Sequence, residues 1–191
     1  KEEDKAILTA WMGLPDNHYP TEEEDWEGSL VLPRELKIVN DKLYQLPVPQ
    51  ILELRQEKVE PTGYLPRVAE VQVKHTGGNA QLTLFSKPDG TGGLQLSYDA
   101  ARKTVTINRS QMELRFNQEI GEVLEVPLEN DLTDITLYLD RSSVEIFFNK
   151  GEATFTTHLY PTEQEDSYEA SPNLDLEIWT LRSSVTDDFV V

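Results

Sequence analysis

The sequence predicts an all-β protein. Along most of the chain apolar residues alternate with polar ones, and short clusters of turn-forming residues separate the alternating stretches. A period of two places the apolar side chains of a strand on one face of a sheet. We therefore expect an antiparallel β-sandwich of two sheets over residues 64–191, preceded by a partial β-propeller blade in residues 1–47 and a linker with a short helix in residues 48–63.

The composition excludes several classes of function. The chain has 191 residues, and its 17 Lys and Arg residues against 35 Asp and Glu residues give a net charge of −18. This charge argues against nucleic acids and anionic membrane surfaces as partners, because both are bound through basic residues. The absence of Cys excludes disulfides, thiol catalysis and cysteine metal sites. No apolar run is long enough to span a membrane.

Neither a cofactor nor a metal ion is expected. The three histidines, His18, His75 and His158, lie far apart and show no ligand spacing. Two acidic clusters, residues 22–25 and 163–166, lack the spaced oxygen ligands and the turn glycine of a calcium loop, so we interpret them as solvated charge. No signal peptide is visible and we expect a cytoplasmic location, although the sequence starts at Lys1 and its natural N-terminus can lie upstream.

The first region has the strand pattern of a single propeller blade. Residues 6–12 form a nearly continuous apolar run, which is typical of a strand buried on both faces. A long loop follows, Asn40-Asp41 forms a later turn, and Arg34-Glu35 is interpreted as a structural pair. One blade cannot bury its own faces, so we expect this region to pack against further chain. The predicted strands are residues 6–12, 29–32, 36–39 and 43–46.

The second region has the pattern of a sandwich, with short alternating strands and frequent turns. Its clearest part is residues 134–159, which predict three consecutive antiparallel strands. Ile146 and Phe148 belong to the face expected inside, whereas Glu145 alternates to the polar face, where we expect a cross-strand or turn contact. An acidic loop is expected over residues 162–173. The other strand cores are residues 69–73, 82–84, 94–98, 105–107, 123–126 and 174–179.

Several separated motifs carry a resemblance to one family. The stretch Leu139–Asn149, followed by Gly151-Glu152, resembles the late signature of glycoside hydrolase family 32, which comprises invertases, sucrose-6-phosphate hydrolases, inulinases and levanases. Five motifs in the first region occur in the same order as at the end of the family's propeller, so the resemblance covers essentially the whole chain. They are Trp11-Met12-Gly13-Leu14-Pro15-Asp16, Tyr19-Pro20-Thr21, Trp26-Glu27-Gly28, Leu32-Pro33-Arg34-Glu35-Leu36 and Leu43-Tyr44-Gln45.

The resemblance implies a β-fructofuranosidase that hydrolyses β-fructosides with retention, with sucrose or sucrose 6-phosphate as substrate. Such an enzyme uses a nucleophilic carboxylate and an acid/base carboxylate about 5–5.5 Å apart. In the family these belong to Trp-Met-Asn-Asp-Pro-Asn-Gly and Glu-Cys motifs, with a further Asp in Arg-Asp-Pro, and none of the three motifs occurs here. We therefore expect no catalytic residue in this chain, and a structural role next to the missing part of a five-bladed propeller.

Trp11 is the one substrate-binding candidate. In members of the family an aromatic residue of this blade lines the fructose pocket, and an indole offers an apolar platform and one N–H donor to a sugar. The alternative interpretation is that Trp11 belongs to the core of the blade. Asp16, His18 and Tyr19 follow on a loop of the kind that reaches binding sites, but an ordinary polar loop is the interpretation we favour.

A second class of function stays open, namely a stand-alone carbohydrate-binding or assembly module. A module predicts a self-contained fold and measurable sugar binding, whereas the C-terminal portion of an enzyme predicts a large apolar or neutral face where the propeller is missing. The apolar run at residues 6–12 favours the enzyme portion. Because exposed apolar strand edges recruit other chains, we also expect either self-association through residues 5–47 or loose packing of that region on the sandwich.

Overall fold

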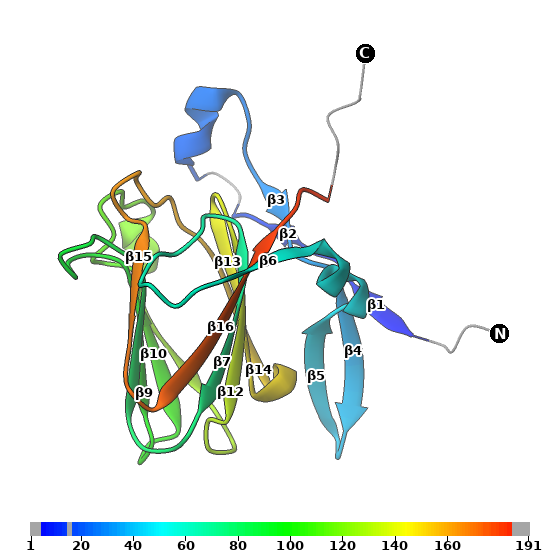
Figure 1. Ribbon diagram of the computed structural model, residues 1–191. Coiled ribbons are helices and arrows are strands. Elements are labelled where there is room, and N and C mark those ends of the chain that lie inside the picture. Colours follow the sequence, from blue (N-terminus) through cyan, green and yellow to red (C-terminus); the bar gives the residue numbers. More distant parts are fainter. Residues whose placement is uncertain (1–4, 15–16, 185–191) are drawn as a thin grey trace.

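The computed structural model describes residues 5–14 and 17–184 of the chain. Strands dominate, and the described helices are all short 3-10 turns (Figure 1). In chain order the elements are β1 (Ala6–Leu8), β2 (Trp11–Met12), η1 (Pro20–Glu24), β3 (Ser29–Leu30), β4 (Arg34–Val39), β5 (Lys42–Pro47), η2 (Pro49–Leu54), β6 (Arg55–Val59), β7 (Ala69–His75), β8 (Ala80–Ser86), β9 (Leu94–Asp99), β10 (Thr104–Asn108), η3 (Gln118–Ile120), β11 (Val123–Pro127), β12 (Asp134–Asp140), β13 (Ser143–Phe148), η4 (Asn149–Gly151), β14 (Ala153–His158), β15 (Ser167–Ala170) and β16 (Leu174–Leu181).

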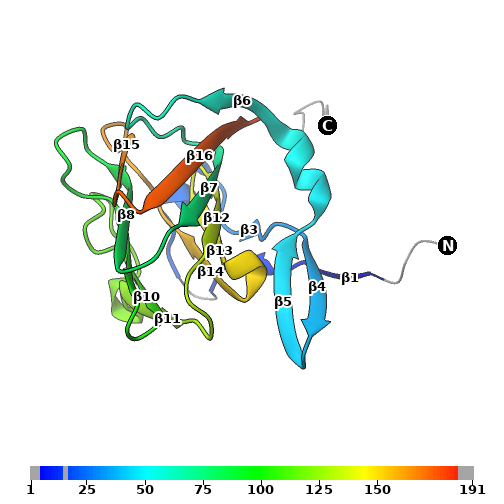
Figure 2. The same ribbon diagram turned by 60° about the horizontal axis from the view of Figure 1, so that its bottom comes forward.

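Two antiparallel sheets face each other and enclose the core (Figures 1 and 2). The five-stranded sheet has the order β11-β10-β9-β8-β15, and the six-stranded sheet has the order β14-β13-β12-β7-β16-β6. Side chains of the inner faces, such as Val71, Leu84 and Ile146, are fully buried between the sheets. The predicted all-β antiparallel sandwich is confirmed.

The three strands predicted over residues 134–159 form as expected, and β12, β13 and β14 pair in sequence. Phe148 lies fully buried on the inner face. The opposite face of β13 is also buried, since Glu145 is 4% and Phe147 1% exposed. The expectation of a polar outer face at Glu145 is therefore wrong, because side chains of the N-terminal strands cover it.

Residues 48–63 contain more structure than the predicted linker. The expected short helix is present as the 3-10 helix η2, and β6 follows directly and pairs with β16 at the edge of the six-stranded sheet. The residues of β6 are mostly polar, since an edge strand needs no strong apolar alternation to pair through its backbone. The boundary between the two predicted domains stays a prediction.

The acidic loop expected over residues 162–173 contains another edge strand. Ser167–Ala170 forms β15 and pairs with β8, with a register shift between Ser167 and Tyr168. Glu165, just before this strand, is fully buried and accepts hydrogen bonds from the amides of Glu113 and Thr162. This carboxylate is therefore structural and not part of a solvated charge cluster.

The N-terminal strands form two small sheets, β1-β4-β5 and β2-β3, beside β13 and β14 (Figures 1 and 2). The predicted turn at Asn40-Asp41 is present, with φ of 51° and 62°. The expectation of one strand over residues 6–12, buried on both faces, is wrong. The strand breaks after Leu8, and Ile7 and Trp11 are 49% and 55% exposed, because β1 and β2 are edge strands in the described residues.

Candidate functional site

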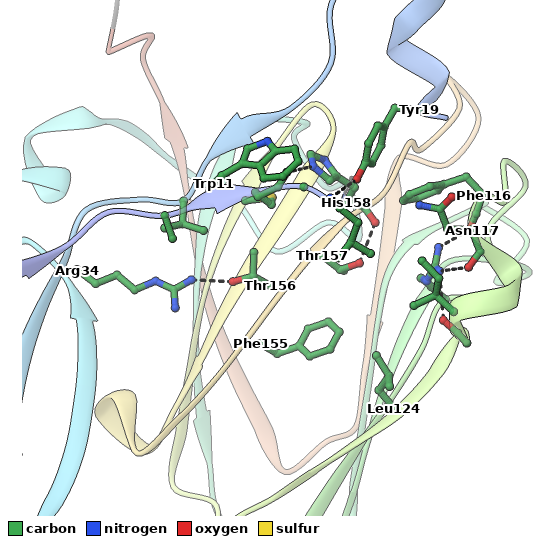
Figure 3. A pocket seen from close by; sticks show the side chains of 18 of the residues that line it. Trp11, Tyr19, Arg34, Phe116, Asn117, Leu124, Phe155, Thr156, Thr157 and His158 are labelled. Carbon is green, nitrogen blue, oxygen red and sulfur yellow. Dashed lines mark hydrogen bonds between the residues drawn. The ribbon is translucent and has the colours of Figure 1, made fainter. Parts of the chain in front are cut away.

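A cavity of about 450 Å³ lies where the N-terminal strands meet the sandwich, and we call it the junction groove (Figure 3). Trp11 and Arg34 line it from the N-terminal strands, and Phe155 and His158 line it from β14. The segment around η3 supplies the remaining wall. The groove is therefore built from three parts of the chain that are distant in sequence.

Trp11 lies at the groove with about half of its surface exposed. Its indole packs closely over the backbone of Gly13, where an added Cβ would lie only 2.3 Å from the ring. A side chain at position 13 would therefore displace the indole. Within the described residues Trp11 is 55% exposed, so it is not part of a closed core of the blade there. Its contact with a sugar stays a prediction.

His158 connects the strand of Trp11 to the sandwich. Its Nε2 lies 2.7 Å from the carbonyl oxygen of Met12, and its Nδ1 lies 2.9 Å from the carbonyl oxygen of Ser142. Because both partners only accept, a neutral imidazole with one N–H donates to one of them at a time. The ring also stacks on Tyr160, with centroids 6.1 Å apart and planes 6° from parallel. This role could not be predicted from the sequence, because His158 is an isolated histidine.

Arg34, which lines the groove, forms a buried ion pair with Glu145. The Arg34 Nη2 atom donates to Glu145 Oε2 at 2.6 Å, and the Leu32 amide donates to Glu145 Oε1 at 2.6 Å. Burial raises the pKa of Glu145 above its ordinary value, and the bonds from Leu32 and Arg34 oppose that rise. The predicted pairing of Arg34 with Glu35 is wrong, because Glu35 contacts Lys5 and Lys37 instead.

The wall around η3 is held by one half-buried cation. The Arg109 guanidinium donates to the carbonyl oxygens of Phe116, Asn117 and Gly121 and lies 4.8 Å from the Phe116 ring centroid. Burial lowers the pKa of Arg109. Asn117 has φ of 48°, a left-handed conformation in which Asn is enriched among non-glycine residues. The sequence pattern was uninformative here, because this wall has no regular strand.

The groove offers binding groups and no acid/base pair. Among the described residues that line it there is no Asp or Glu, so it holds neither a nucleophilic nor an acid/base carboxylate. Likewise, the described ranges contain no cluster of three or more potential metal ligands. Of the loop residues considered from sequence, Tyr19 lines the groove, exposed His18 pairs with Glu22 at 3.1 Å, and Asp16 lies outside the described residues.

The fold and the groove define a class: a two-sheet antiparallel sandwich that carries strands of a second β-domain against its outer face. The description "Glycosyl hydrolases family 32 C terminal" matches residues 51–179, and "Glycosyl hydrolases family 32 N-terminal domain" matches residues 1–47. The chain belongs to glycosyl hydrolase family 32, and the predicted resemblance is confirmed.

Named relatives agree with this assignment. The chain is 32% identical over 165 residues to the sucrose-6-phosphate hydrolase of Streptococcus mutans, which covers 84% of the chain and 34% of the relative. It is 34% identical over 180 residues to the raffinose invertase of Escherichia coli, which covers 89% of the chain and 37% of the relative. The chain thus spans about a third of the length of the curated relatives it matches.

Solved structures show the same fold. The sucrose-6-phosphate hydrolase of Lactobacillus gasseri superimposes with a TM-score of 0.84 at 25% identity, over 94% of the chain and 39% of that structure. The β-fructofuranosidase of Bombyx mori gives a TM-score of 0.77 at 24% identity, over 97% of the chain and 40% of that structure.

No helix in the described part of the chain has the length and apolar character needed to cross a membrane.

Proposed function

We propose that the chain is the C-terminal portion of a β-fructofuranosidase that hydrolyses sucrose, sucrose 6-phosphate or a related β-fructoside with retention. The names of the relatives, sucrose-6-phosphate hydrolases and a raffinose invertase, support this substrate class. The two matched ranges, 1–47 and 51–179, support a division into final propeller strands and a sandwich. The cytoplasmic location also stays part of this proposal.

The proposed role of the chain within that enzyme is to hold Trp11 in place for a sugar. The observation that carries the proposal is the set of buried contacts that join the strand of Trp11 to the sandwich. His158 contacts the Met12 carbonyl next to Trp11 at 2.7 Å, and the Arg34–Glu145 pair fixes the strand beyond it. Since the carboxylate motifs of the family are missing from this sequence, the chain itself is proposed to be non-catalytic.

The test is an assay of the purified chain with sucrose. We expect no release of fructose above the level of a buffer control, because loss of both carboxylates removes most of a large rate enhancement. The matched control is a full-length sucrose-6-phosphate hydrolase assayed in parallel. Steady fructose release by the purified chain, at a rate comparable to that control, would contradict the proposal.

The stand-alone module is the alternative, and the exposed surface argues against it. Of the fourteen large apolar side chains that are exposed in the described residues, eight lie within residues 5–47. Examples are Leu30 at 71% and Ile38 at 77%. A complete module has no reason to concentrate exposed apolar side chains in one region, whereas strands of a larger propeller do. Self-association through residues 5–47 stays a prediction, which sedimentation velocity over a range of concentrations tests directly.

A further inference from the structure

We propose that Gly13 and Gly28 are positioning residues for Trp11, and that together they fix the indole so that its six-membered ring, and not its N–H group, is presented to the junction groove. This inference rests on the proposed function, in which Trp11 contacts a sugar. It adds two residues to that site. It also replaces the N–H donor expected from the sequence by an apolar contact surface.

The two glycines lie opposite each other at the end of the β2–β3 pair. Met12 is aligned with Ser29 in this antiparallel pair, so the next positions on the two strands are Gly13 and Gly28. Side chains alternate along an extended strand, which places positions 11 and 13 on the same face. The Trp11 ring therefore lies over two residues without side chains. An aromatic ring that covers glycine in this way is a recurrent arrangement in β-sheets.

Both glycines approach the same atom of the ring. A Cβ added at Gly13 would lie 2.6 Å from Trp11 Nε1, and a Cβ added at Gly28 would lie 2.7 Å from it. Real Cβ contacts are not this short, so a side chain at either position displaces the indole. The edge of the ring that carries Nε1 thus faces the backbone of the two glycines. Figure 3 shows the six-membered ring on the side of His158, within the groove.

Backbone conformation alone does not explain the glycine at position 13. Gly28 has φ of 78°, in the left-handed region that favours glycine, whereas Gly13 is not among the residues with positive φ. The backbone at Gly13 therefore accepts an L-residue without strain. The three atoms nearest to its added Cβ all belong to Trp11, so the indole is what excludes a side chain there.

The orientation of the ring decides what Trp11 offers to a ligand. The indole Nε1–H is a donor, and it is the one polar group of the side chain. With that edge against the glycines, the exposed remainder of the ring is an apolar aromatic surface, which suits the C–H face of a sugar ring. Because Trp11 is 55% exposed, a displaced ring has solvent to rotate into, so its orientation depends on the two glycines.

The experiment measures the orientation of the indole by nuclear magnetic resonance in the complete 191-residue chain, labelled with nitrogen-15 and carbon-13 and free of sugar. The chain has three tryptophans, and Trp11→Phe assigns the indole signal of Trp11. We expect nuclear Overhauser contacts from its Nε1–H to the α-protons of both glycines. Gly13→Ala should shift the indole signal and abolish the contact with Gly28. The urea midpoint should change little, because the ring moves into solvent.

Gly78 provides a matched control for Gly28. The two residues have φ of 81° and 78°, but an added Cβ at Gly78 meets no atom within 4 Å. Gly28→Ala and Gly78→Ala therefore strain the backbone to a similar degree, and both should lower the urea midpoint. Only Gly28→Ala should also shift the Trp11 indole signal and abolish its contact with Gly13.

The outcomes separate the parts of the inference. An unchanged indole signal in Gly13→Ala overturns the positioning role of Gly13, and an unchanged signal in Gly28→Ala overturns that of Gly28. Absence of both contacts in the wild-type chain overturns the orientation itself, and this measurement does not require any variant to fold. Each of these results leaves the proposed function standing, because the fructose-release assay judges it independently.

Conversely, a chain that releases fructose contradicts the proposed function and leaves the measured orientation of Trp11 unchanged.

Discussion

Removing one partner of the Arg34–Glu145 pair is the sharpest perturbation of the junction. The two side chains are 7% and 5% exposed, and their charged atoms lie 2.6 Å apart. Glu145→Leu leaves Arg34 charged and buried, with only the Gln45 amide oxygen and two threonine hydroxyls as acceptors. The same substitution leaves the Leu32 amide without its 2.6 Å acceptor. Arg34→Met leaves Glu145 with that amide as its one remaining donor.

The expected magnitude follows from burial. Each single substitution should lower the free energy of unfolding by about 3–5 kcal/mol, because it leaves an uncompensated buried charge. The double variant, Arg34→Met with Glu145→Leu, replaces both charges by apolar groups and should cost far less than the sum, since such replacements are often close to neutral. The non-additivity should exceed by far the ~0.3–0.5 kcal/mol within which independent sites add.

Urea denaturation of the four chains, followed by circular dichroism, measures this cycle. The matched control is the surface pair Arg102–Glu125, whose side chains are 58% and 50% exposed and whose removal should cost about 1 kcal/mol or less. Additive effects at Arg34 and Glu145, or single effects as small as those of the control pair, would refute the claim that the N-terminal strands are fastened to the sandwich through this contact.

Two further predictions concern the sandwich itself. Phe148→Ala should lower the free energy of unfolding by about 3–5 kcal/mol, because the ring is fully buried between the sheets; an unchanged urea midpoint would mean that the wrong face of β13 was placed inside. The second concerns Glu145, whose pKa is raised by burial, so the folded chain binds its proton more tightly than the unfolded chain does. The unfolding free energy of the wild type minus that of Glu145→Gln should therefore fall as the pH rises from the ordinary glutamate pKa of 4.5 through the raised value; a difference that grows with pH contradicts this.

The sandwich was predictable because its core strands alternate and its turns have distinctive residues. The pairing of β12, β13 and β14 follows from apolar alternation interrupted by short polar joints. The turn at Asn40-Asp41 was also predictable, since both residues tolerate the positive φ that a tight hairpin requires. These signals are local, so they do not depend on which other parts of the protein the chain packs against.

The two edge strands β6 and β15 were not predictable from the same signals. Both are short and mostly polar, and each joins a sheet by pairing its backbone with a neighbour distant in sequence, as Lys58 does with Trp179. Backbone hydrogen bonds leave no trace in a pattern of side chains. The segment before Val123 has the same difficulty, because Arg109 fixes it through carbonyl oxygens that every residue carries.

The candidate site was predictable at one residue only, and by resemblance. Trp11 belongs to a family motif, whereas His158 and Asn117 contribute through contacts that no spacing encodes. His158 contacts the carbonyl oxygen of Met12, 146 positions away in the sequence, and its ring lies between this oxygen and the carbonyl oxygen of Ser142. Asn117 has a weak signal, since an Asn in an irregular segment favours the left-handed conformation observed.

The burial of the outer face of β13 could have been predicted from the sequence, but the alternation of apolar and polar residues was followed instead. Residues 144–148 read Val-Glu-Ile-Phe-Phe, which is nearly continuous in apolar character, and continuous apolar runs are typical of strands buried on both faces. Glu145 is the exception that identifies the partner, because a buried carboxylate requires a buried cation and Arg34 supplies it. Phe147 lies under the same guanidinium, 5.0 Å from its ring centroid. A sandwich separated from residues 1–47 would therefore expose a phenyl ring and leave a carboxylate without its counter-ion, which makes the N-terminal strands part of its stability and not a passive remnant.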